Sequence, residues 1–162
     1  MGAALHLRGV VLPADESREI WIRDGLITFE PVRDAETVAS NCWLVPGLVD
    51  AHNHIGMDPS GAVTDVDAQR DQALADRNAG ALLIRDCGVP VDTRHLDDHH
   101  DLPRIIRAGR HLAPYRRYLP GVGMELDDPA ELPGAVVDQA RRSDGWVKLV
   151  GDWIEREVGD LA

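Results

Sequence analysis

The sequence predicts an α/β protein in which a short all-β segment precedes parallel β/α units. Asp24-Gly25 lies between two apolar-rich runs and is typical of a two-residue β-hairpin turn. Beyond Pro46, apolar runs of strand length alternate with segments of helical periodicity. Alternation of this kind favours a parallel sheet, because each crossover brings the chain back to start the next strand in the same direction. We therefore expect two parts, residues 1–45 and 46–162.

The first part is expected to consist of short antiparallel strands. The Asp24-Gly25 turn pairs the runs 18–23 and 26–30. Apolar residues within 5–11 predict one or two strands before this hairpin. The polar stretch 31–41 indicates a turn or a weak strand.

The second part is expected to contain four parallel strands. The apolar run that leads into residues 52–54 predicts a buried strand. The other three strands are expected at 81–87, 104–108 and 146–150.

Two helices are predicted between these strands. The first spans 64–78, is followed by the stop signal Gly80, and presents one face made of Val66, Ala73, Leu74 and Arg77. The second begins at a capping-box pattern, DPAE at 128–131, and ends near Ser143. It is expected to bury Leu132, Val136, Val137 and Ala140. The crossover 89–103 has only weak helical character.

Composition excludes several classes of function. A net charge of −11 argues against a nucleic-acid partner, because binding phosphate backbones needs the opposite sign. No apolar stretch approaches the roughly 18 residues that a membrane span needs. The first residues lack the basic and apolar regions of a signal peptide, so a cytoplasmic location is expected. Cys42 and Cys87 do not form a disulfide framework.

His52 and His54 are the strongest candidate ligands in the chain. Side chains alternate along a strand, so the two imidazoles share one face at the end of a predicted strand. Two imidazoles so placed can chelate one divalent cation. The alternative is a pair of buried, hydrogen-bonded histidines without a metal.

Lys148 lies inside a predicted apolar strand, where an amine is costly to bury. One explanation is an ion pair with a carboxylate such as Asp86 or Asp152, and another is a lysine whose amine reaches water at the strand end. A third is that the amine has reacted with carbon dioxide. The resulting carbamate is anionic and has two oxygens, so it can bridge two metal ions.

Three segments resemble the amidohydrolase superfamily. The segment PGLVDAHNH at 46–54 resembles its strand-one signature, and WVKL at 146–149 is similar to its carboxylated-lysine segment on strand four. The segment IRDCG at 84–88 is similar to strand two in the prolidase-like and imidazolonepropionase-like branch. The resemblance implies a small β-sandwich portion at 1–45. It also implies the first half, about four β/α units, of a TIM-type (β/α)8 barrel at 46–162.

The resemblance also implies a function. Members are metal-dependent hydrolases of carbon–nitrogen bonds, in amides or cyclic amides, and act on small molecules through metal-activated water. By this resemblance His52 and His54 hold the more buried metal, and Lys148 as a carbamate bridges to a second one. One or two Zn²⁺ ions are expected from the ligand types, although other divalent metals fit as well.

The sequence holds only part of the family's site. A complete barrel takes about 250 residues, whereas 46–162 contains 117 (162 − 45). The family's later metal-binding histidines, on strands five and six, and its catalytic Asp on strand eight have no counterpart, since the last histidine is His111. We expect a fragment corresponding to the N-terminal half.

Two other hypotheses stay open at this point. The chain could act as an inactive metal-binding or association module, forming homo-oligomers through open half-barrel edges. It could also be a truncated piece without a function of its own.

Other polar residues are weaker candidates. Asp50 is expected to be structural or to support the ligands. Asp86 is expected either to face the site or to pair with Arg85 or Arg107. His111 and Tyr115 are expected to belong to a substrate pocket or to an ordinary surface loop, and Trp153 is expected to line the pocket or to cover the core. The histidine-rich segment 94–101 is expected to be a solvated loop.

Overall fold

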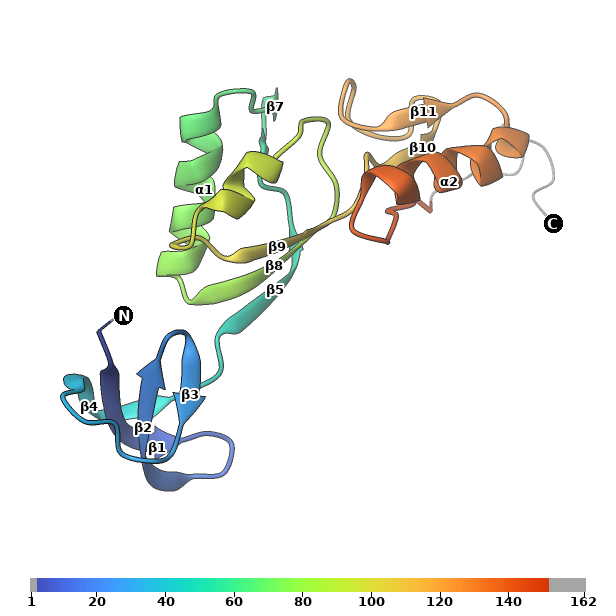
Figure 1. Cartoon of the computed structure of the whole chain (residues 1–162). Coiled ribbons are helices and arrows are strands. Elements are labelled where there is room, and N and C mark those ends of the chain that lie inside the picture. The colour runs from blue at the N-terminus through green and yellow to red at the C-terminus, as the bar shows by residue number, and fades with distance from the viewer. Residues whose placement is uncertain (1–2, 152–162) are drawn as a thin grey trace. The chain divides into compact units, whose positions relative to one another are not determined.

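The computed structural model describes residues 3–151. The chain divides into two compact units, an N-terminal unit (Met1–Pro46) and a C-terminal unit (Gly47–Ala162). Figure 1 shows the strands and helices of both units.

The N-terminal unit is a four-stranded sheet with the order β3-β2-β1-β4. Its strands are β1 (Leu5–Val11), β2 (Glu16–Arg23), β3 (Leu26–Thr28) and β4 (Glu36–Leu44), drawn in blue to cyan in Figure 1. The predicted hairpin is confirmed, because β2 and β3 pair antiparallel. Asp24 and Gly25 have φ angles of 51° and 76°, the left-handed values that a two-residue hairpin turn requires.

Strand β4 differs from its prediction as a turn or weak strand. It is nine residues long and pairs with β1 in parallel, so the expectation of antiparallel strands throughout this part is wrong. The pairing is irregular, with register shifts on either side of Leu7 and Arg8, and Asn41 takes a left-handed φ of 55°. Backbone groups make these ladder bonds, which explains why a polar sequence can form the strand.

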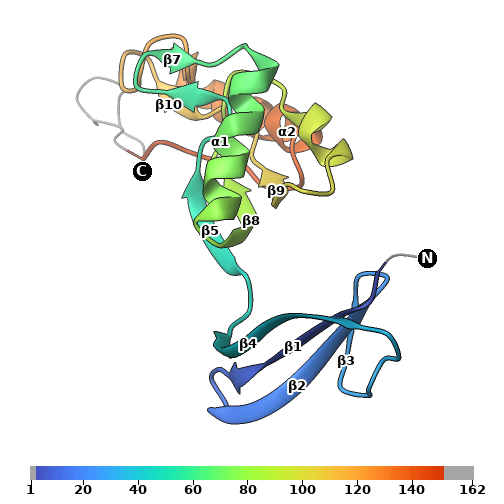
Figure 2. The ribbon, with the colours of Figure 1, turned by 90° about the vertical axis from the view of Figure 1, so that its left-hand side faces the viewer.

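The C-terminal unit contains a parallel sheet with the order β5-β8-β9. These strands are β5 (Leu48–Asn53), β8 (Ala81–Asp86) and β9 (Arg104–Arg107). The short pair β6 (Met57–Asp58) and β7 (Gly61–Ala62) follows β5. Helix α1 (Val66–Asn78) then lies along the sheet beside β8 (Figures 1 and 2). One core cluster forms where α1 meets the strands, and it comprises Ile55, Ala73, Ile84, Leu96 and Ile105.

Helix α1 begins where the sequence provides a cap. The Asp65 carboxylate accepts hydrogen bonds from the backbone N–H groups of Asp67 (2.9 Å) and Ala68 (3.1 Å). The buried face carries Gln69 and Ala73, whereas Val66 is exposed, so the predicted helix face is shifted. The amide nitrogen of Gln69 donates to the Val63 carbonyl (2.6 Å), whereas its buried oxygen has no hydrogen-bond partner among residues 3–151.

A second group of elements follows β9. It consists of β10 (Leu112–Pro114) and β11 (Met124–Leu126), which pair in parallel, and of helix α2 (Leu132–Arg142). Two single 3-10 turns, η1 (Arg94–Asp98) and η2 (Pro129–Glu131), precede β9 and α2. Leu112, Leu126 and Ala135 form the second core cluster. None of the helices within residues 3–151 is long and apolar enough to cross a membrane.

The predicted capping pattern begins the 3-10 turn η2 rather than α2, which starts at Leu132 without a side-chain cap and buries a different face from the predicted one. Asp128 accepts a hydrogen bond from Ala130 N–H (2.8 Å), as expected of a capping residue before Pro129. Ala135 and Gln139 are buried, and the Gln139 side chain accepts from Arg110 N–H (2.8 Å). Val136 and Val137 are exposed, so their predicted burial is wrong.

Two predictions about the strands also need correction. The segment 146–150 forms isolated parallel bridges, Ala108 with Trp146 and Leu112 with Leu149, rather than a continuous strand. In β5, Leu48 and Val49 are 57% and 59% exposed, so the prediction of a buried strand is wrong. Leu82 of the central strand β8 is also 55% exposed, so the described residues leave apolar side chains of this sheet uncovered.

Candidate metal centre

His52 and His54 lie together at the carboxyl end of β5. Their ring centres are 5.3 Å apart, with the rings inclined at 70°. Two imidazoles that bind one tetrahedral zinc at about 2.0–2.1 Å per nitrogen have ring centres about 5 Å apart. The spacing of this pair therefore suits chelation of one cation.

The ring of His54 is held in one tautomer by the backbone. Its Nδ1 lies 3.0 Å from the carbonyl oxygen of Gly88, just after β8. A carbonyl only accepts hydrogen bonds, so Nδ1 carries the hydrogen and Nε2 keeps its lone pair. Burial is the main cause that lowers the pKa of His54 below 6.5, and the charges of His52 and Lys148 lower it further. The lower pKa favours the neutral imidazole, which is the form that binds a metal.

Asp50 and Asn53 organise the strand end around the two histidines. Asp50 accepts from His52 N–H (3.0 Å) and from the Asn53 amide (2.7 Å), and these two bonds hold its pKa below the usual value. The same Asn53 amide donates to Asp76 of α1 (3.0 Å), and its oxygen accepts from His54 N–H (2.6 Å). Asp50 thus supports the backbone of the pair.

Lys148 approaches the same histidines from a distant part of the chain. Its segment is tied to β10, because Leu112 N–H donates to the Lys148 carbonyl (2.9 Å). The charge of Lys148 lowers the pKa of His54 and of His111. Lys148 is also the only lysine in the sequence, against 16 arginines (17 − 1). The single occurrence of lysine is a signal that no motif contains, and it draws attention to the Lys148 amine.

The alternative ion-pair partners for Lys148 give little support to a salt bridge. Asp152 lies outside the described residues. Asp86 is fully buried, and one of its oxygens accepts from Gly88 N–H (2.6 Å). The other oxygen has no hydrogen-bond partner among residues 3–151. Arg107, a proposed partner of Asp86, donates instead to Asp97 (2.9 Å) and Thr93 (2.7 Å), and Arg85 stacks on Trp146 (4.0 Å).

His111 is buried against the pair. Its ring centre lies 5.2 Å from that of His54 and 4.6 Å from that of Tyr118. Neither ring nitrogen has a hydrogen-bond partner among residues 3–151. Burial lowers the pKa of His111 to about 4, so the ring is neutral near pH 7. A neutral imidazole with a free donor and a free acceptor can bind a polar group of a ligand.

The remaining candidates lie apart from this cluster or beyond the described residues. Tyr115 is half-exposed and stacks with Arg116 (4.9 Å), so Tyr118 is the tyrosine that contacts His111. Trp153 lies outside the described residues. In the segment 94–101, His99 and His100 are exposed. The contribution of Gly88 was not predicted, although a glycine directly after a strand is a signal for special backbone geometry.

A resident divalent metal fits this arrangement in part. Two features suit a metal ion or a polar ligand: the ring nitrogens of His111, which have no hydrogen-bond partner among residues 3–151, and the fixed tautomer of His54. Yet no group of three or more His, Cys, Asp or Glu side chains within residues 3–151 is arranged to hold a metal ion. The predicted ligands present are the imidazoles of His52 and His54, with the Lys148 amine close enough for its charge to lower the pKa of His54. Together they make one side of a site.

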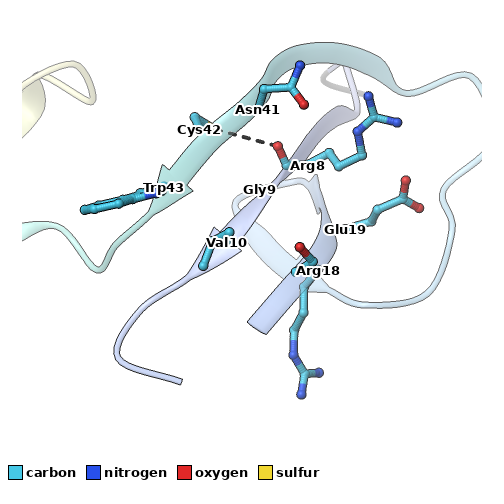
Figure 3. Close-up of a pocket in the computed structure, with 9 residues that line it drawn as sticks. Arg8, Gly9, Val10, Arg18, Glu19, Asn41, Cys42 and Trp43 are labelled. Atoms are coloured by element: carbon cyan, nitrogen blue, oxygen red, sulfur yellow. Dashed lines mark hydrogen bonds between the residues drawn. The ribbon is translucent and has the colours of Figure 1, made fainter. Parts of the chain in front are cut away.

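A separate hollow of about 490 Å³ lies entirely within the N-terminal unit. Figure 3 shows Cys42 and Trp43 of β4 on one side of it and Arg8 to Val10 of β1 on the other. The Cys42 thiol contacts the Arg8 carbonyl (3.7 Å). The hollow contains none of the predicted ligands.

Comparison with curated proteins finds relatives in mycobacteria. An uncharacterized protein of Mycobacterium tuberculosis and one of Mycobacterium bovis are each 58% identical to this chain over 158 residues, which is 98% of the chain. The chain spans 42% of the length of these relatives. No protein-family model matches the chain.

Solved structures with a similar fold include several hydrolases. An amidohydrolase matches with a TM-score of 0.66 and 19% identity, covering 91% of this chain and 46% of its own. A molinate hydrolase matches with 0.65 and 16%, covering 91% and 45%. A Xaa-Pro dipeptidase with methionine bound in its active site matches with 0.63 and 17%, covering 91% and 47%. At these identities the matches show the fold alone.

Proposed function

We propose, from the premise that this chain has the fold of the N-terminal half of an amidohydrolase-superfamily protein, that it provides one side of a metal site for hydrolysing carbon–nitrogen bonds. The substrate class is a small amide or cyclic amide. The observation that supports this most is His54, whose ring is fixed by Gly88 with Nε2 free and with His52 beside it.

Each residue has a role in this proposal. His52 and His54 would hold the metal, for which zinc suits the nitrogen ligands. Lys148, as a carbamate, would supply the anionic oxygens that the described residues lack. A bound divalent metal supplies Lewis-acid activation of water and of the substrate carbonyl. His111, neutral and unpaired, would hydrogen-bond a polar group of the substrate.

We also propose how the two units correspond to the parts of an amidohydrolase fold. The sheet of the N-terminal unit would correspond to the β-sandwich portion of such proteins. The parallel strands β5, β8 and β9, with the segment 146–150, would correspond to the first four strands of a TIM-type barrel. The donors gather at the carboxyl ends of these strands, where barrels of this type carry their chemistry.

The carbamate gives the first test. With zinc and ¹³C-labelled bicarbonate, the chain is expected to show one carbamate carbon signal from a side chain, because Lys148 is its only lysine. Lys148→Arg keeps the charge and is expected to lose that signal. The N-terminal amine is the only other primary amine, and its signal would survive in this variant.

Hydrolysis is tested in a chimera in which this chain replaces the matching segment of the Mycobacterium tuberculosis relative. With zinc and bicarbonate, the chimera is expected to cleave members of a panel of Xaa-Pro dipeptides and cyclic amides. Lys148→Arg is expected to lower kcat/KM about 100-fold, the order of effect that follows loss of a metal-supporting group. A folded, zinc-loaded chimera that cleaves no amide would overturn the proposed function.

A second candidate function is association with another copy of the chain. Leu48, Val49 and Leu82 are each more than half exposed on β5 and β8, and an exposed apolar edge strand favours pairing. Sedimentation analysis is expected to show dimers or larger species. Val49→Lys should shift them towards monomer, whereas Val136→Lys on α2 should not. A wild-type chain that stays monomeric at all concentrations contradicts this candidate.

A further inference from the structure

Asp86 is a fully buried carboxylate at the end of β8, directed at the backbone rather than at solvent. One oxygen accepts from Gly88 N–H at 2.6 Å, two residues further on. A charged acceptor makes this bond stronger than a bond between neutral groups. The second oxygen has no hydrogen-bond partner within residues 3–151. The Gly88 bond is therefore the one hydrogen bond that the Asp86 side chain makes there.

Gly88 connects this carboxylate to His54. Its N–H donates to Asp86 and its carbonyl accepts from His54 Nδ1 at 3.0 Å. The backbone of Gly88 has a φ of 104°, where side-chain sterics do not fix the conformation of a glycine. Something else must therefore hold the orientation of the carbonyl.

Backbone hydrogen bonds hold the chain around the turn at Gly88, whereas the N–H of Gly88 itself donates to the Asp86 side chain. Cys87 N–H donates to the Asn53 carbonyl (2.8 Å), and Ala108 N–H donates to the Asp86 carbonyl (2.9 Å). These bonds join the ends of β5, β8 and β9. Within residues 3–151, the N–H of Gly88 donates its hydrogen bond to the Asp86 side chain.

We propose that Asp86 is a positioning residue that selects the tautomer of His54 by way of Gly88. The carboxylate holds the turn so that the Gly88 carbonyl takes the Nδ1 hydrogen, and Nε2 is then left free. The use of that free nitrogen for a metal rests on the proposed function, but the selection of the tautomer does not.

The tautomer is read directly by ¹⁵N NMR of the imidazole ring in the metal-free chain, above the ordinary histidine pKa of about 6.5. In the unchanged chain His54 is expected to be the Nδ1–H tautomer. Asp86→Ala removes the acceptor and is expected to lower the ratio of Nδ1–H to Nε2–H roughly tenfold, as expected for loss of a charge-assisted hydrogen bond. Asp86→Asn keeps an acceptor oxygen and is expected to restore most of the ratio.

Asp92→Ala is the matched control. Asp92 accepts from Arg94 N–H (3.0 Å) in the same two-residue arrangement and in the same unit, but it has no link to Gly88. It is expected to leave the His54 tautomer unchanged. A folded Asp86→Ala chain that keeps the Nδ1–H tautomer would falsify the proposal.

The unchanged chain provides a second measurement that needs no variant. A hydrogen-bond coupling between His54 Nδ1 and the Gly88 carbonyl carbon is expected, and an Nε2–H tautomer in the unchanged chain overturns the proposal even if Asp86→Ala does not fold. No metal or substrate is present in either measurement. Failure of zinc binding or hydrolysis would therefore count against the proposed function and leave this result standing.

Discussion

Replacing His52 and His54 together by alanine is expected to abolish zinc binding by the chain. The two rings are the only pair of imidazoles at the end of β5, and their 5.3 Å separation suits one cation. Loss of a residue that merely supports a ligand already weakens metal binding by roughly 10- to 100-fold. Loss of two direct ligands should exceed the upper end of that range. Competition dialysis against a chelator of known affinity measures the change.

A control removes two histidines that are not expected to bind. His99→Ala with His100→Ala deletes the same number of imidazoles from exposed positions. Its zinc affinity is expected to match that of the unchanged chain. Equal weakening by both double variants would mean that zinc binds histidines of this chain without a defined site, and the assignment to His52 and His54 would be withdrawn.

The sequence was sufficient to predict the neighbourhood of this pair. A period of two along a strand places His52 and His54 on one face whatever the rest of the fold does. The capping bond of Asp128, which begins the 3-10 turn η2, and the hairpin at Asp24-Gly25 were predictable for the same reason, since each depends on a few consecutive residues. In local patterns of this kind, the residues that form the pattern also make the interactions that stabilise the structure.

Burial was not predictable in the same way, because it depends on what covers a face. Val136 and Val137 follow a helical pattern, yet Ala135 and Gln139 are the residues that α2 buries. Gly109, which has no side chain, lies against the Gln139 side chain, and this contact belongs to the buried face of α2. Leu48 and Val49 are as apolar as residues of a buried strand, but none of the described residues covers them, and they are more than half exposed.

Long-range backbone contacts were also beyond a reading of the sequence. The parallel pairing of β1 with β4 joins segments separated by a hairpin, and neither strand encodes the direction of its partner. The contact between Gly88 and His54 joins residues 34 positions apart. It depends on the register between β5 and β8, which shifts after Asp50. Such a contact is visible only once both strands are placed.

Replacing Gly88 by alanine is expected to destabilise the C-terminal unit by about 4 kcal/mol, from backbone strain and a steric clash together. The φ of 104° lies in a region that L side chains rarely adopt. A methyl group there would stand 2.2 Å from the carbonyl oxygen of Gly109. That oxygen belongs to the backbone, so it cannot rotate away as a flexible side chain would.

Gly121→Ala separates the two causes of this loss. Gly121 has a comparable φ of 77° but open space where a methyl group would stand, so only the backbone strain of about 1–2 kcal/mol is expected. Hydrogen exchange of the Cys87 and Ala108 amides, which bond across β5, β8 and β9, reports the stability of the sheet in each variant. If the two variants lose the same protection, the approach to Gly109 is not a tight one. If Gly88→Ala loses more protection from hydrogen exchange than Gly121→Ala, the turn at Gly88 is held by close packing as well as by hydrogen bonds. The Gly88 carbonyl is then a rigid acceptor for the His54 ring.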